Sequence, residues 1–251
     1  MKLARDTWLI FHRQLLLMFR TPIWIAIGLI QPIVYLLLFA PLLKVALGAT
    51  SYAGAYRVYI PGLLTALVLF GGLFSGFTLL GELRSGVIER FRVTPVSRLA
   101  LLLGRAMRET VALIVQAILI TILALPFGLT VGLGGLLLAY ALLALMALAA
   151  SSVSYGITLM VRSDAALAPV VNTISQPLAL LSGTLLPLAL APHWLRTAAD
   201  GNPFFWAVQG LRSMFASQLS APVVWESLVI VAALTVFAVG WSARLFSTRV
   251  Q

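Results

Sequence analysis

The sequence predicts an all-α polytopic membrane protein, with an amphipathic interfacial helix at its start, six transmembrane helices, and short re-entrant helices before the last span. Hydrophobic residues make up 61% of the 251 residues and charged residues only 10%. The mean hydropathy of +1.06 is far above that of soluble domains. Polar stretches are too short for a second domain, so residues 1–251 are expected to form a single membrane domain.

Charge-free stretches locate the spans, because an ionised side chain at the bilayer centre costs at least about 2.5 kcal/mol. A helix needs about 20 apolar residues to cross. Residues 110–161 can hold two spans, since Pro126 and the glycines within 125–135 predict a turn between them. The other spans are expected within 21–43, 58–81, 165–190 and 222–243.

The distribution of lysine and arginine predicts the orientation, because these residues favour the cytoplasmic side. With both termini inside, that side receives thirteen of the seventeen basic residues. We therefore expect a multi-pass protein of the bacterial cytoplasmic (inner) membrane with both termini in the cytoplasm. Contacts with anionic membrane lipids account for much of the net charge of +10, so no nucleic-acid partner is expected.

Residues 1–20 have the pattern of an amphipathic helix. Apolar residues recur at spacings of three and four on one face, namely Trp8, Phe11, Leu15 and Met18. Charged residues recur at every seventh position on another face, namely Asp6, Arg13 and Arg20. This predicts a helix in the cytoplasmic interface whose apolar face dips into the acyl boundary. The alternative is a cytosolic extension of the first span.

Charges concentrate in residues 82–108, a cytoplasmic connection between the second and third spans. Val87, Ile88 and Phe91 are spaced like one face of a short helix, which Thr94 and Pro95 would end. Ser97 can cap the helix that follows. A solvated loop whose arginines only set the orientation is the alternative, but it does not explain the acidic Glu82 and Glu89 or the apolar face.

Residues 190–221 are too polar to cross the membrane and too apolar for a solvated loop. A turn at 200–203 and the aromatic residues at 204–206 predict two short helices that re-enter the outer leaflet. An aromatic belt at the membrane surface is the alternative.

Polar and aromatic residues within the spans are candidates for a substrate path. The expected path residues are Gln31, Tyr35, Phe70, Phe74, Phe77, Asn172 and Gln176. Hydrogen bonding between helices is the alternative role for the amides. Gly72 and Gly76 form a GxxxG pair, which predicts close helix packing and a possible contact with a second chain.

Several kinds of chemistry have no support in the sequence. Cysteine is absent, and His12 and His193 lie far apart, so no metal site is expected. No GxxxxGK[ST] run occurs, so the chain lacks this means of binding ATP phosphates. We see no buried catalytic set for an intramembrane enzyme. An ion-coupled secondary transporter would need an inverted repeat and ionisable groups deep in the spans, and neither is evident. A structural or assembly protein stays open, but it does not explain the charged connection.

The connection 82–108 resembles the loop after the second span in membrane subunits of type-2 ABC exporters, especially the daunorubicin-resistance and nodulation-factor export permeases. That family carries here a glutamate, a glycine, an acid followed by a base, then Thr-Pro and a small or polar residue. The matching residues are Glu82, Gly86, Glu89, Arg90, Thr94, Pro95 and Ser97. "YIPGLL" at 59–64 and "NPFFWAVQGLR" at 202–212 also resemble family segments, so the resemblance covers essentially the whole chain.

The resemblance implies a permease subunit, not itself an enzyme, that exports an amphipathic drug, lipid or lipid-linked glycan. It implies a separate ABC ATPase in two copies, which binds ATP and Mg, and a second permease chain, as a homodimer or with a paralogue. This chain is expected to bind no cofactor. Residues implied to couple to the ATPase are Glu82, Arg84, Gly86, Val87, Ile88, Glu89, Arg90, Phe91, Arg92, Thr94 and Pro95. Those implied to form an outer gate are Asn202, Pro203, Phe204, Phe205 and Arg212.

Overall fold

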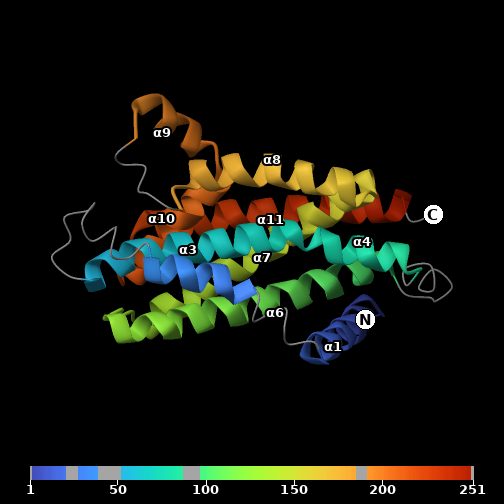
Figure 1. Ribbon diagram of the computed structural model, residues 1–251, viewed down its shortest axis with the longest axis horizontal. Coiled ribbons are helices and arrows are strands. Elements are labelled where there is room, and N and C mark those ends of the chain that lie inside the picture. Colours follow the sequence, from blue (N-terminus) through green and yellow to red (C-terminus); the bar gives the residue numbers. More distant parts are fainter. Residues whose placement is uncertain (1, 21–27, 39–51, 87–96, 185–190, 250–251) are drawn as a thin grey trace.

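The computed structural model describes residues 2–20, 28–38, 52–86, 97–184 and 191–249. Within these ranges all regular secondary structure is helical. The following helices run side by side as a bundle (Figure 1). They are α3 (Tyr52–Phe74), α4 (Gly76–Arg84), α6 (Arg98–Ala124), α7 (Leu133–Val161), α8 (Asp164–Ser182) and α11 (Pro222–Arg249).

Five helical stretches in the described residues are long and apolar enough to cross a membrane. They lie at 54–84, 98–127, 133–161, 164–182 and 222–248, and so correspond to the second to sixth expected spans. The first expected span is described only as the helix Gly28–Leu38, and its flanks lie outside the described residues. An all-α polytopic membrane protein is therefore confirmed.

The ends of several helices follow from local sequence. Ser97 caps α6, because its Oγ accepts a hydrogen bond from Ala100 N at 3.1 Å. The predicted turn between the third and fourth spans contains the short 3₁₀ helix η1 (Leu125–Phe127) and a left-handed Gly128 with φ of 91°. Both details confirm expectations drawn from residue type alone.

Helix α7 occupies the centre of the bundle and packs against α3, α6, α10 and α11. Its small residues Ser151, Ser152 and Ser154 are fully buried. A Cβ added at Gly76 would lie 2.5 Å from Ser154 Oγ and closer still to Thr158 Oγ1. The close packing predicted for the GxxxG pair is thus confirmed, and its partner is α7 of the same chain.

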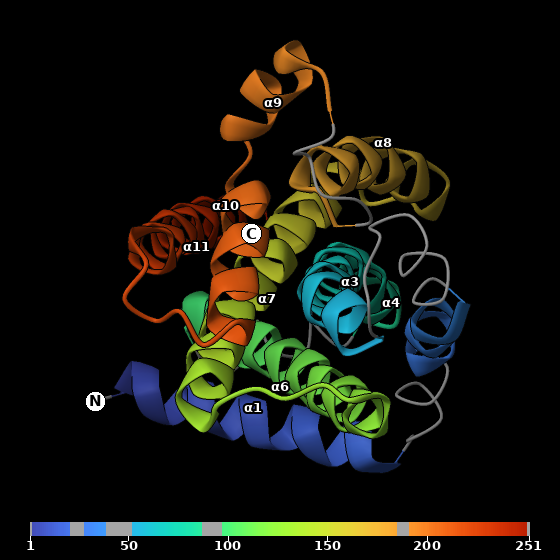
Figure 2. The same cartoon turned by 90° about the vertical axis from the view of Figure 1, so that its left-hand side faces the viewer.

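Helix α1 (Lys2–Arg20) lies across one end of the bundle, beneath α6 (Figure 2). Its Ile10 is buried with Ala100 and Leu101 of α6. The face turned to the protein differs from the predicted apolar face: Phe11 and Met18 are buried, but Trp8 is 60% exposed and Thr7 and Gln14 are buried instead. Packing on α6 and the polar contacts of Gln14 determine which face of α1 is buried. The periodicity of the sequence alone does not reveal these contacts.

At the opposite end of the bundle, residues 191–221 form α9 (His193–Asp200) and α10 (Pro203–Phe215). α9 projects from the bundle, and α10 packs against α3, α7, α8 and α11 (Figure 1). The prediction of two short helices here is confirmed.

Candidate functional site

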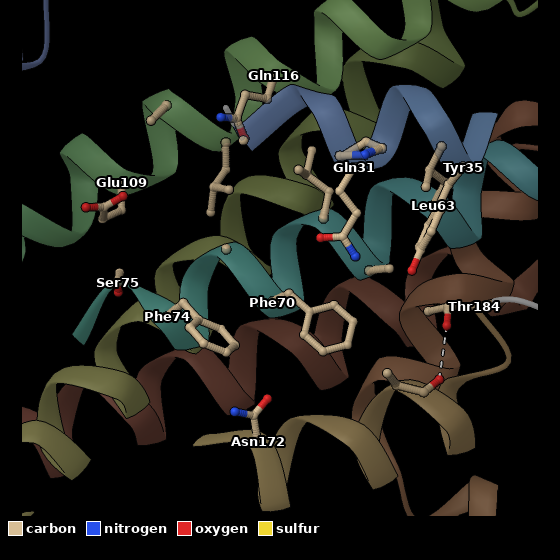
Figure 3. A pocket seen from close by; sticks show the side chains of 18 of the residues that line it. Gln31, Tyr35, Leu63, Phe70, Phe74, Ser75, Glu109, Gln116, Asn172 and Thr184 are labelled. Atoms are coloured by element: carbon tan, nitrogen blue, oxygen red, sulfur yellow. Dashed lines mark hydrogen bonds between the residues drawn. The ribbon is translucent and has the colours of Figure 1, made fainter. Parts of the chain in front are cut away.

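A cavity of about 710 Å³ lies between the helix Gly28–Leu38, α3, α6 and α8 (Figure 3). Each of these helices contributes residues spaced three or four apart, so that one face of each points inward. The volume falls within the range of about 300–1,000 Å³ that small-molecule sites occupy.

The cavity brings together six of the seven residues expected on a substrate path. Gln31 and Tyr35 come from the first helix, Phe70 and Phe74 from α3, and Asn172 and Gln176 from α8. Phe77 is not part of the lining, but its ring stacks on Phe74 with centroids 5.8 Å apart. The lining combines aromatic rings and amides, which suits a ligand with apolar and polar parts. Transport through it stays a prediction.

The end of the cavity nearer α1 is charged. Arg108 and Glu109 of α6 line it and form an ion pair with each other, near Ser75. Glu109 is only 12% exposed. Sequence reasoning missed this pair because it began the third span after Glu109, whereas α6 begins at Arg98. The signal was present: Glu109 and Gln116 are seven residues apart and therefore share a helix face, and both line the cavity.

The other end of the cavity lies near Tyr35 and Thr184. The predicted outer-gate residues attach α10 close to this end. Asn202 caps α10 through Phe204 N at 3.0 Å, and its Nδ2 donates to Leu178 O of α8 at 2.9 Å. Pro203 is the first residue of α10, and the Phe205 ring meets the Trp206 ring edge-on.

Arg212 ties α10 to two cavity helices. Its Nη2 donates to Gly183 O at 2.8 Å and its Nε to Val58 O at 3.3 Å. Burial lowers the pKa of Arg212 to about 10, so the guanidinium remains charged at neutral pH. A movement of α10 would therefore be transmitted to the second turn of α3 and to the end of α8.

Only three residues of the predicted ATPase-coupling set are described, at the end of α4. Arg84 forms an exposed ion pair with Asp164 at the start of α8. Gly86 has a φ of 69°, the left-handed conformation that ends many helices. The remaining eight, Val87 to Arg92, Thr94 and Pro95, lie outside the described residues.

Glu82, the third, points into the protein. Its Oε2 accepts from Arg105 Nε at 2.8 Å, and its Oε1 accepts from Gln14 Nε2 at 3.0 Å. Arg105 is only 4% exposed. The carboxylate thus joins α1, α4 and α6, and its role in ATPase coupling stays a prediction.

No group of three or more metal-ligating side chains occurs among the residues that the structure describes. Comparison of the sequence with known proteins identifies its family. A family model described as an ABC-2 type transporter matches residues 5–216. The chain belongs to the ABC-2 type transporter family.

Individual relatives are consistent with this family. The chain is 25% identical to the putative transport permease ycf38 of Cyanophora paradoxa over 78% of its own length and 69% of that protein. It is 25% identical to ycf38 of Porphyra purpurea over 82% and 72%, respectively. It is 22% identical to the daunorubicin resistance ABC transporter permease protein DrrB1 of Streptomyces coeruleorubidus over 74% and 66%. This ABC-2 protein is therefore a multi-pass membrane permease subunit of an ABC transporter, not itself an enzyme, and the family implies an ABC ATPase partner.

Proposed function

We propose that this ABC-2 permease exports an amphipathic compound, a drug, lipid or lipid-linked glycan, from the cytoplasm or inner leaflet, and that the cavity is its path. The observation that carries the proposal is the lining of that cavity, where Phe70 and Phe74 of α3 lie among the amides of Gln31, Asn172 and Gln176. Aromatic rings can hold the apolar part of such a molecule, while amides hydrogen-bond the polar part.

In this proposal two copies of a separate ATPase bind ATP and Mg and pull on the connection 82–108. A second permease chain, a homodimer in the simplest case, completes the transporter in the bacterial cytoplasmic membrane. Support comes from the position of α4, which leads from the cavity residue Ser75 directly into that connection. A force applied to the connection would therefore reach the cavity along one short helix.

Transport in inverted membrane vesicles tests the proposal. With a fluorescent amphiphile as probe, Phe70→Ala and Asn172→Ala should each lower ATP-dependent uptake at least about fivefold, the effect of losing about 1 kcal/mol of binding contact. Phe237→Ala is the matched control, because Phe237 of α11 is 71% exposed and lies outside the cavity lining. Equal effects of all three variants would rule out the cavity as the path.

Energy coupling can be checked on the same membranes. A tagged chain should capture an ABC ATPase in mild detergent, and the double variant Glu89→Ala with Arg90→Ala should lose it. The alternative, an ion-coupled secondary transporter, predicts that a proton or sodium ionophore abolishes uptake while vanadate has no effect.

A further inference from the structure

The ion pair at the α1 end of the cavity has unused hydrogen-bonding capacity on both partners. Glu109 Oε1 accepts from Arg108 Nη1, and no described residue donates to its second oxygen. Arg108 Nε is buried and has no hydrogen-bond partner in the described residues. Both side chains line the cavity. A buried N–H without an acceptor is rare in proteins, and here it belongs to a guanidinium group whose side chain lines the cavity.

The charges around this end balance. The second ion pair of the region, Arg105 with Glu82, is satisfied by its own contacts and by Gln14. The two pairs together contain two guanidinium groups and two carboxylates. A ligand with a single charge would be attracted to one member of the Arg108–Glu109 pair and repelled by the other. A ligand that carries both charges can engage both members at once.

One wall of the cavity beyond the ion pair suits an apolar tail. Leu67, Phe70 and Phe74 follow one face of α3 away from the ion pair. Leu180 of α8 also lines the cavity and is 66% exposed, which leaves an apolar rim at the surface of the bundle. A headgroup at Arg108 and Glu109 would therefore have an apolar face of α3 for the chain attached to it, opposite the amides of the cavity.

We propose that this end of the cavity binds the headgroup of a zwitterionic amphiphile. Its ammonium group hydrogen-bonds the second oxygen of Glu109, and its phosphate or carboxylate binds the guanidinium of Arg108. This inference rests on the proposed function, because it defines the substrate class of the same cavity. It distinguishes the expected substrate from purely cationic and purely anionic amphiphiles.

Lipid binding to the purified full-length chain, followed by native mass spectrometry, tests the inference. The probes share dioleoyl chains and differ only in their headgroups: phosphatidylethanolamine (zwitterionic), phosphatidylglycerol (anionic) and trimethylammonium propane (cationic). The native chain should prefer phosphatidylethanolamine over each of the others by about tenfold, which corresponds to about 1.4 kcal/mol.

The variants should change the order of preference and not only the affinity. Glu109→Gln should shift the preference toward phosphatidylglycerol, and Arg108→Gln toward the cationic lipid. Glu226→Gln and Arg244→Gln remove the same charges at exposed positions outside the cavity lining and should leave the preference unchanged. A misfolded variant would lose all three lipids equally, so opposite shifts in the two variants cannot arise from unfolding.

Soluble glycerophosphoethanolamine separates two sources of the same headgroup. Displacement of the lipid by this compound at similar concentration would identify a water-soluble zwitterion as the ligand, whereas failure to displace it would identify a lipid. Unchanged headgroup preference in both variants would overturn the inference. If Phe70→Ala still lowered uptake of the fluorescent amphiphile in vesicles, the proposed function would stand without this inference. If neither effect appeared, the proposed function and the inference would both fail.

Discussion

Glu82 shows how one side chain can hold three helices at the edge of a membrane protein. Its two oxygens bind Arg105 of α6 and Gln14 of α1, while its own backbone belongs to α4. Arg105 also reaches Leu101 O within its own helix. An ion pair taken out of water offsets its desolvation cost only with such additional hydrogen bonds. The geometry of this pair therefore fixes where α1 lies beneath the bundle.

Removal of one partner should be costlier than removal of both. Glu82→Ala leaves the Arg105 charge buried without its partner, which should lower the free energy of unfolding by about 3–5 kcal/mol. Glu82→Met combined with Arg105→Met replaces the pair with apolar groups and should restore most of that loss. Thermal unfolding of the purified protein in detergent measures both. A single variant as stable as the native chain would show that the pair does not hold α1, α4 and α6 together.

At the scale of the element, the second membrane-crossing stretch is broken at Ser75, between α3 and α4. Ser154 of α7 supports the break, because its Oγ accepts from Gly76 N at 2.9 Å and donates to Leu73 O. Ser75 Oγ donates to Gly72 O at 2.7 Å. These side chains replace backbone hydrogen bonds of a continuous helix, so the helix can be interrupted at Ser75 without leaving polar groups unpaired in the membrane.

Two glycines of α4 give a matched test of this junction. Gly76→Ala places a Cβ against Ser154 and Thr158 and should destabilise the protein by about 1–3 kcal/mol, the usual cost of overpacking. A Cβ at Gly81, one turn and a residue further along, would meet nothing within 4 Å. Gly81→Ala should therefore be neutral or stabilising by up to about 1 kcal/mol. Thermal unfolding in detergent compares the two, and equal effects would contradict a junction closed by α7.

The elements differ in how far the sequence could predict them. The cap of α6 at Ser97, the turn at η1 and the pair α9–α10 follow from residue type and charge spacing. The orientation of α1 does not, because its buried face depends on Gln14 reaching Glu82, sixty-eight residues away. Likewise, six path residues could be chosen as polar or aromatic positions in apolar spans, whereas Arg108 and Glu109 required the true start of α6.

For the whole molecule, the two ends of the bundle have different chemistry. One end carries α1, the end of α4, the start of α6 and the end of α11, where Arg98 of α6 donates to Ser247 O. The other carries α9, α10 and η1 (Figure 1). The predicted path and the predicted coupling connection meet at the end that carries α1. An ATPase on that side could act on the cavity without crossing the bilayer, provided that this end is cytoplasmic.

Cysteine labelling can test this orientation, because the chain contains no cysteine. Ser85→Cys, Thr197→Cys and Ser247→Cys replace exposed residues at the end of α4, in α9 and at the end of α11. In intact cells a membrane-impermeant maleimide should label only Thr197→Cys, since α6, α7 and α8 separate Ser85 from Thr197. Permeabilised cells should label all three. The reverse pattern would show that the protein has the opposite orientation in the membrane. Labelling of both Ser85→Cys and Thr197→Cys in intact cells would mean that one of these three helices does not cross the membrane.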